Sequence, residues 1–132
     1  MRVVLDASAA VGAVAGDKKQ FVTKMLVGTS RVIAPDLFIP EVTNGLWKYI
    51  YARALTLDEA FERFDSALTL VNRFYPVADL APAALREAAA HRHPAYDLYY
   101  VVLARREGAA ILTVDGRMKD LCRAIGVPLA DA

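Results

Sequence analysis

The chain has 132 residues, a single cysteine and a formal net charge of only +1. This length suits one ordinary domain with its own hydrophobic core, so we expect a single domain over residues 1–132. The near-neutral charge argues against a protein that coats nucleic acid non-specifically, because that needs a dominant basic field. One cysteine excludes an internal disulfide framework and fits a reducing compartment, and the apolar run at 7–16 is too short to span a bilayer. We therefore expect a cytoplasmic protein.

Hydrophobic periodicity and turn signals predict an alternation of strands and helices. Ser8 is expected to cap the first helix, Pro40 suits the first turn of a later one, and Thr56 with Glu59 has the spacing of a capping box. Pro82 is expected to open a further helix, and Gly108 to end the one after it. In chain order, we predict strand 3–5, helix 8–14, helix 18–26, strand 31–34, helix 41–53, helix 56–72, strand 74–77, helix 82–93, helix 96–107, strand 110–113, helix 116–125 and strand 127–129.

The alternating order of these elements predicts the fold class. Strands separated by helices imply right-handed crossovers between parallel strands, with helices covering both faces of the sheet. The first strand reads as a continuous apolar run, which is typical of a strand that is buried on both faces. We therefore expect an α/β protein, a three-layer α/β/α sandwich with a mostly parallel central sheet.

Four carboxylates are placed to meet at one edge of that sheet. Asp6 and Asp115 each follow a predicted strand, and neighbouring parallel strands end at the rim where open α/β sheets bind their ligands. Glu41 and Asp97 lie in the first turns of helices that begin near the same rim. Either of these two, taken alone, is more often a charge that complements a helix dipole. The four together predict an acidic site.

A cluster of four carboxylates needs positive charge. Each pair at about 4–6 Å repels by roughly 3–4 kcal/mol at an effective dielectric near 20. The six pairs together would cost about 15 kcal/mol or more, which rivals the stability of a domain. An all-oxygen ligand set favours Mg²⁺ or Mn²⁺ over zinc. Phosphodiester hydrolysis is the natural chemistry of such ions. We expect Asp6 and Asp97 to hold the principal ion, with Glu41 and Asp115 completing the site directly or through water.

Three polar residues are candidates to support this site. Asn44 lies three residues after Glu41, so both project from one face of the helix. Ser8 and Thr113 each lie two residues from a site aspartate, where they can bond a ligand or a phosphate, although helix capping is an equally good role for either.

Basic and aromatic residues offer weaker signals. Arg117, Lys119 and Lys48 can line an approach for an RNA backbone, but a solvated face explains them better. His91 and His93 stand at a predicted helix end, where a cation complements the dipole, and we do not assign them a catalytic role. The middle helices carry many aromatic side chains, of which core packing explains most and a partner groove the rest: Trp47, Tyr49, Tyr51, Phe61 and Phe64.

The order and spacing of four short motifs resemble the PIN domain. They are Asp6-Ala7-Ser8-Ala9, Glu41-Val42-Thr43-Asn44, Tyr96-Asp97 with Tyr99-Tyr100, and Thr113-Val114-Asp115. Each is weak alone, and together they cover nearly the whole chain. A free-standing PIN domain of this size is similar to the VapC-type toxins of bacterial and archaeal toxin–antitoxin pairs. The resemblance implies an endoribonuclease that acts on RNA, a small antitoxin protein as partner, and a homodimer.

Other functions remain open at this point. The chain can be a catalytically idle PIN-fold module that binds RNA or a protein, or a solitary RNA-processing nuclease without an antitoxin. An aspartate-nucleophile phosphatase also places an aspartate after its first strand. That chemistry usually needs a second aspartate two residues later, where this chain has Ser8, so we rank it low.

Overall fold

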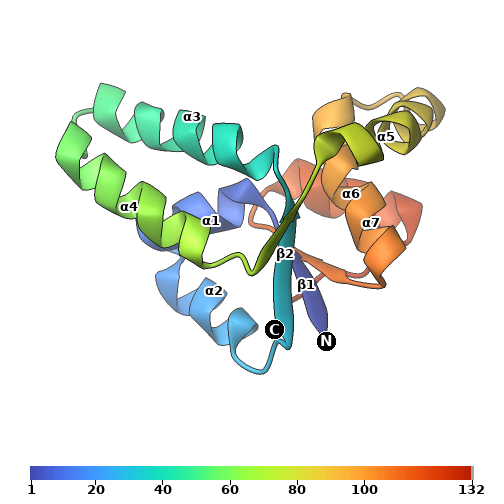
Figure 1. The fold of residues 1–132 in the computed structure, drawn as a ribbon, viewed down its shortest axis with the longest axis horizontal. Helices are drawn as coiled ribbons and strands as arrows, with labels where there is room; N and C mark the ends of the chain where they lie inside the picture. Colours follow the sequence, from blue (N-terminus) through green and yellow to red (C-terminus); the bar gives the residue numbers. More distant parts are fainter. Residues whose placement is uncertain (132) are drawn as a thin grey trace.

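The computed structural model describes residues 1–131, and over that range the chain forms four strands and seven helices (Figure 1). The strands are β1 (Arg2–Leu5), β2 (Arg31–Pro35), β3 (Arg73–Tyr75) and β4 (Ala110–Leu112). The helices are α1 (Ala7–Val14), α2 (Lys19–Leu26), α3 (Phe38–Tyr51), α4 (Leu57–Thr69), α5 (Val77–His91), α6 (Ala95–Glu107) and α7 (Gly116–Ile125). Among these helices, none combines the length and apolar character that a bilayer crossing requires.

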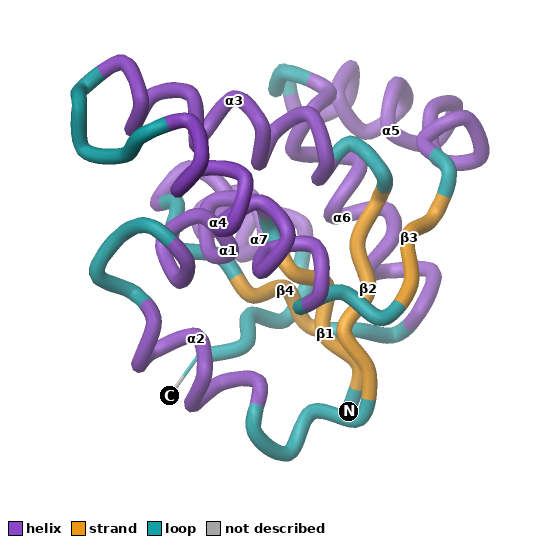
Figure 2. The backbone as a smooth tube through the Cα atoms, turned by 60° about the vertical axis from the view of Figure 1, so that its left-hand side comes forward, coloured by secondary structure: helices purple, strands orange, loops and turns teal. Residues whose placement is uncertain are grey.

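All four strands are parallel and lie in the order β3-β2-β1-β4 (Figure 2). In the register of the two central pairs, Val3 lies opposite Val32 on one side and Ala110 on the other. An isolated parallel bridge between Ile111 and Leu129 takes the place of the last predicted strand. The predicted α/β class with a parallel central sheet is confirmed.

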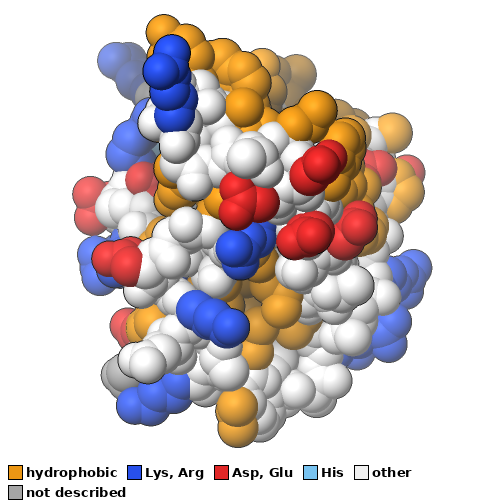
Figure 3. Space-filling view, turned by 90° about the vertical axis from the view of Figure 1, so that its left-hand side faces the viewer, with side chains coloured by type: hydrophobic (Ala, Val, Ile, Leu, Met, Phe, Trp, Pro, Cys, Tyr) orange, Lys and Arg blue, Asp and Glu red, His pale blue; other side chains and the backbone are white. Residues whose placement is uncertain are grey.

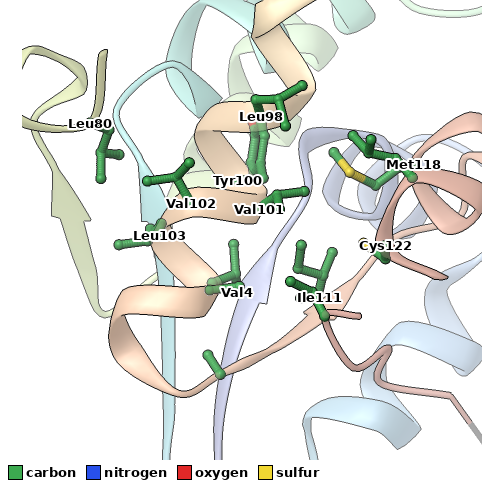
Figure 4. Packing of buried hydrophobic residues seen from close by; sticks show 14 of the residues in the cluster. Val4, Leu80, Leu98, Tyr100, Val101, Val102, Leu103, Ile111, Met118 and Cys122 are labelled. Atoms are coloured by element: carbon green, nitrogen blue, oxygen red, sulfur yellow. The ribbon is translucent and has the colours of Figure 1, made fainter. Parts of the chain in front are cut away.

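Helices cover both faces of the sheet because strand side chains alternate between them. Val4, Ile33 and Ile111 point to the layer of α5, α6 and α7. The buried part of α6 is its middle, at Leu98 and from Tyr100 to Ala104 (Figure 4). Val3 and Leu5 point to the opposite layer, which contains α1, α2, α3 and α4. The carboxyl ends of β1 and β4 lie side by side, and the backbone N–H of Asp6 donates to the Leu112 carbonyl at 2.9 Å.

Two predicted helix boundaries are wrong, and each lies beside a hydrogen bond between residues far apart in the sequence. Helix α5 begins at Val77, five residues before Pro82, since an Asp36 carboxylate oxygen accepts a hydrogen bond from the Val77 backbone N–H at 3.1 Å. Pro82 then lies inside the helix, where its missing N–H removes one helical hydrogen bond. Helix α4 has the predicted capping box but ends at Thr69, and the Asn72 side chain accepts from the backbone N–H of Val32 at 2.7 Å.

Helix α3 also begins earlier than predicted. It starts at Phe38, a fully buried residue, and Pro40 occupies its third position, where a missing N–H costs no helical hydrogen bond. Glu41 therefore lies at the end of the first turn and still near the rim of the sheet. The early start lets Phe38 pack against Phe74 of β3, with ring centroids 5.6 Å apart.

Candidate metal centre

Asp6 is the most deeply buried carboxylate of the site. It follows β1 directly, is 6% exposed, and its Oδ2 accepts hydrogen bonds from Thr113 Oγ1 at 2.6 Å and Ser8 Oγ at 2.7 Å. Burial raises the pKa of Asp6, with smaller contributions from Asp97 and Asp115, while the two hydroxyl hydrogen bonds lower it. The expectation that Ser8 caps α1 is wrong, because Asp6 occupies the cap position and Ser8 bonds its carboxylate instead.

Glu41 is held by a tyrosine from another helix. Its Oε1 accepts a hydrogen bond of 2.6 Å from the hydroxyl of Tyr100, which is fully buried on α6. Burial raises the pKa of Glu41 to about 7; the Tyr100 hydrogen bond opposes this shift, and the charges of Asp6 and Asp97 add to it. Glu41 thus titrates near neutral pH.

Asp97 lies in the first turn of α6 and faces a histidine. His93 Nε2 is 3.6 Å from Asp97 Oδ2, one helical turn earlier in the chain. Burial raises the pKa of Asp97, and the charge of Asp115 raises it further, whereas His93 and Arg117 lower it. The nearby positive charges therefore only partly offset the rise in the pKa of Asp97 that burial causes.

Asp115 caps the last helix. Its carboxylate accepts from the Arg117 backbone N–H at 3.4 Å, and its own backbone N–H donates to Thr113 Oγ1 at 3.1 Å. Thr113 thus connects Asp6 and Asp115, the two aspartates at the ends of β1 and β4. Arg117 therefore contributes its backbone N–H to the cap of α7, and the charge of its side chain lowers the pKa of Asp97.

All four carboxylates line one open pocket of about 720 Å³ at the carboxyl edge of the sheet. Ser8 and Asn44 line it too, together with the cationic residues Lys18 and Lys48, whereas Thr113, Arg117 and Lys119 are not among its lining residues. On the side of the molecule where α3 and α4 lie, acidic and basic side chains stand next to one another on the surface (Figure 3). The lining of the pocket therefore contains both carboxylates and ammonium groups.

The carboxylate oxygens of the pocket are suitable ligands for a divalent cation, but their side chains are not yet arranged around one ion. Every acidic ligand is a carboxylate oxygen, which suits Mg²⁺ or Mn²⁺. The raised pKa values of Asp6, Glu41 and Asp97 also indicate negative charge that their surroundings do not fully neutralise. Within residues 1–131, however, no three acidic, histidine or cysteine side chains are arranged to hold one ion. An ion shared by three of the carboxylates requires their side chains to move.

Comparison with known families decides the classification. The model of the PIN domain matches residues 3–124. The chain belongs to the PIN-domain family. A curated relative, Ribonuclease VapC3 from Pyrobaculum aerophilum, is 27% identical over 131 residues, which is 97% of this PIN domain and 100% of the relative.

A solved structure supports the fold. The crystal structure of PAE2754 from Pyrobaculum aerophilum superposes on this PIN domain with a TM-score of 0.67 at 21% identity, covering 92% of this chain and 84% of the other. At this level of identity the likeness concerns the fold. The parallel sheet flanked by helices is therefore the PIN-like architecture that the resemblance implied.

Tyr100 and His93 were both noted in the sequence, but their contacts with the carboxylates of this PIN domain were not predicted. Tyr100 bonds Glu41 across 59 residues of chain, a pairing that no local pattern shows. His93 lies four residues before Asp97, which is the spacing that brings side chains together in a helix, but Pro94 between them argued for a chain break. The left-handed Arg92 and extended Pro94 allow the approach without a continuous helix.

The raised carboxylate pKa values predict an unusual pH dependence of stability. A carboxyl with a raised folded pKa stabilises the fold below its unfolded pKa of about 4.5, and this contribution is lost as pH rises through its folded value, about 7 for Glu41. We expect the free energy of unfolding of the EDTA-treated protein to fall by about 1–2 kcal/mol between about pH 5 and pH 8, a figure reduced for the partial solvation of Glu41. Urea titrations at both pH values measure it.

The matched variant is Glu41→Gln, which should remove much of this loss because the amide does not ionise. Added Mn²⁺ should also raise the stability of the unmodified protein at the higher pH, since an ion that binds only the folded state stabilises it. A free energy of unfolding that rises over this interval in the EDTA-treated protein would contradict the assignment.

Proposed function

We propose that this PIN domain is a metal-dependent endoribonuclease, the toxin component of a type II toxin–antitoxin pair, with Mg²⁺ or Mn²⁺ as its cofactor. The observation that carries the proposal is the gathering of Asp6, Glu41, Asp97 and Asp115 around one open pocket. Three of them have raised pKa values, in each case with a neighbouring carboxylate among the causes. The full-length similarity to a protein named as a ribonuclease supports the same activity.

The proposed site contains metal ligands and residues that hold those ligands in place. Asp6 and Asp97 would bind the principal ion, with Glu41 and Asp115 completing its surroundings. A bound divalent ion supplies an activated water and offsets charge on the phosphate and the leaving oxygen. Ser8 and Thr113 fix the Asp6 carboxylate through their hydroxyls.

The remaining lining residues fit a role in substrate binding. Asn44 offers an amide to the pocket, and Lys18 and Lys48 offer ammonium groups to the phosphates of an RNA strand. Lys119 and the Arg117 side chain fit an outer approach at most, since neither lines the pocket. The proposed substrate is therefore one strand of RNA whose phosphates enter a pocket lined by both carboxylates and ammonium groups.

The proposal also covers the assembly and location of the protein. We place residues 1–132 in one domain, which would act in the cytoplasm as a homodimer and be held inactive by a small antitoxin protein. The resemblance to VapC-type toxins supports this assignment. Co-purification with the product of a short reading frame directly upstream is its test, and a chain that purifies alone from its native host would favour a solitary RNA-processing nuclease.

Cleavage of end-labelled RNA tests the enzymatic part. The purified chain should cut single-stranded RNA with Mn²⁺, stop when EDTA is added, and resume when Mn²⁺ is restored. Asp97→Asn, purified in parallel, should leave the RNA intact because it deletes one ligand charge and keeps the shape of the side chain. Cleavage that persists in that variant would reject the site. Calorimetric titration with Mn²⁺ distinguishes the nuclease from a catalytically idle binding module, because the idle module should bind little or no Mn²⁺.

A further inference from the structure

Trp47 is the only tryptophan of the chain, and 53% of it is exposed. It lines a shallow hollow of about 690 Å³ on helix α3, together with Ile39, Pro40, Thr43 and Asn44. Pro40 and Asn44 line the carboxylate pocket as well. The hollow beside Trp47 is therefore an extension of the proposed active site along α3.

Helix α3 presents its functional groups in a fixed order from the acidic site outward. Glu41, Asn44 and Lys48 recur at intervals of three and four residues, so they share one face of the helix, and Trp47 borders that face. At 1.5 Å per residue, Trp47 lies about 9 Å along the helix axis from Glu41. A nucleotide next to the scissile phosphate can reach this distance. The order of carboxylate, amide, indole and ammonium offers successive partners for a cation, a base edge, a base face and a phosphate.

A second aromatic ring supports the indole without burying it. The Tyr51 ring lies one turn further along α3, with its centroid 5.4 Å from that of Trp47 and an interplanar angle of 30°. This contact restrains the indole, while the exposed fraction of Trp47 leaves room for a ligand. Exposed aromatic rings beside basic groups are the usual platform for unpaired bases, because every base has a π-face.

We propose that Trp47 stacks an unpaired nucleobase of the strand whose scissile phosphate lies at the carboxylate pocket. This inference rests on the proposed nuclease function and gives a physical reason for a substrate that is single-stranded at the cleavage site, since bases within a duplex are already stacked on one another. Continuity with the pocket and the charges of Lys18 and Lys48 favour nucleic acid over a protein at this position.

The sole tryptophan makes binding directly observable. In the Asp6→Asn protein with EDTA, which does not cleave, a short single-stranded RNA should quench tryptophan fluorescence in a saturable way. An abasic strand of the same length and charge should quench far less, and so should an RNA duplex. Equal quenching by the abasic strand, or none by RNA, would overturn the stacking proposal.

Steady-state cleavage gives the second readout. Trp47→Ala should raise KM for single-stranded RNA by about five- to tenfold and leave kcat within about twofold, and Trp47→Phe should recover most of the loss. Leu85→Ala is the matched control, because Leu85 is an exposed apolar residue on α5 that lines neither hollow. Cleavage with an unchanged KM in Trp47→Ala would reject the subsite and leave the nuclease function standing.

The remaining outcomes also separate the hypotheses. Base-dependent quenching without cleavage by the unmodified protein would support the subsite and reject the nuclease. If tryptophan emission changes with protein concentration but does not respond to added RNA, a second protein chain covers the indole. That result would overturn the proposal.

Discussion

Asp6→Asn is expected to abolish RNA cleavage and, at the same time, to stabilise the metal-free protein. The activity should fall by about 10³-fold or more, because the variant removes the charge of a central ligand and a bound metal ion contributes several kcal/mol to stabilising the transition state. The shape of the side chain is preserved, and an amide oxygen can still accept the hydrogen bonds that Thr113 and Ser8 donate to Asp6.

The gain in stability follows from the burial of Asp6. Burial raises the pKa of this carboxyl, so its ionised form at neutral pH opposes folding when no cation is present. A neutral amide carries no such penalty. The thermal midpoint of the EDTA-treated variant should therefore exceed that of the unmodified protein at about pH 7.5. The difference should shrink as the pH falls, and should be smallest below the ordinary aspartate pKa of 3.8, where the carboxyl is protonated in both the folded and the unfolded state.

Calorimetric melts with and without Mn²⁺ measure both effects. Added Mn²⁺ should raise the midpoint of the unmodified protein but hardly that of Asp6→Asn. Asp120→Asn is the control, since Asp120 is a solvent-exposed acid on α7 and does not line the pocket. A variant that loses activity together with stability would indicate that Asp6 has a structural role rather than a ligand role.

Much of the fold was predictable because the signals are local. The central strand β1 reads as an apolar run that ends at Asp6, and the capping box of Thr56 and Glu59 marks the start of α4. The start of α5 was not predictable. It depends on the carboxylate of Asp36, which lies 41 residues earlier and caps the Val77 backbone N–H.

The candidate site also has a part that was predictable from the sequence and a part that was not. Asp6 and Asp115 follow neighbouring strands, so their placement at one rim follows from the topology of a parallel sheet. The residues that hold these ligands come from tertiary contacts. Thr113 reaches Asp6 across 107 residues, and Tyr100 reaches Glu41 across 59, and neither pairing has a periodic signature in the sequence.

The Tyr100 contact leads to the second large effect that we expect. Tyr100→Phe deletes one oxygen, keeps the buried ring, and removes the 2.6 Å hydrogen bond to Glu41. That bond favours the ionised carboxylate, so its loss should move the pKa of Glu41 above its present value of about 7. At neutral pH Glu41 would then be largely protonated. We expect a 10- to 100-fold loss in Mn²⁺ affinity and in kcat/KM, the usual size of an effect on groups that orient metal ligands.

The pH dependence distinguishes this positioning role from simple destabilisation. The acidic limb of the kcat/KM profile should shift to higher pH in Tyr100→Phe, so that part of the lost activity returns as the pH is raised. ¹³C NMR of labelled glutamate in the metal-free protein should show the same upward shift of the Glu41 titration, and calorimetry should show the weaker binding of Mn²⁺. The control, Tyr99→Phe, removes a hydroxyl from the neighbouring residue of α6. If Tyr100→Phe only lowers the melting temperature, with an unshifted titration of Glu41 and unchanged Mn²⁺ affinity, then Tyr100 serves the core alone.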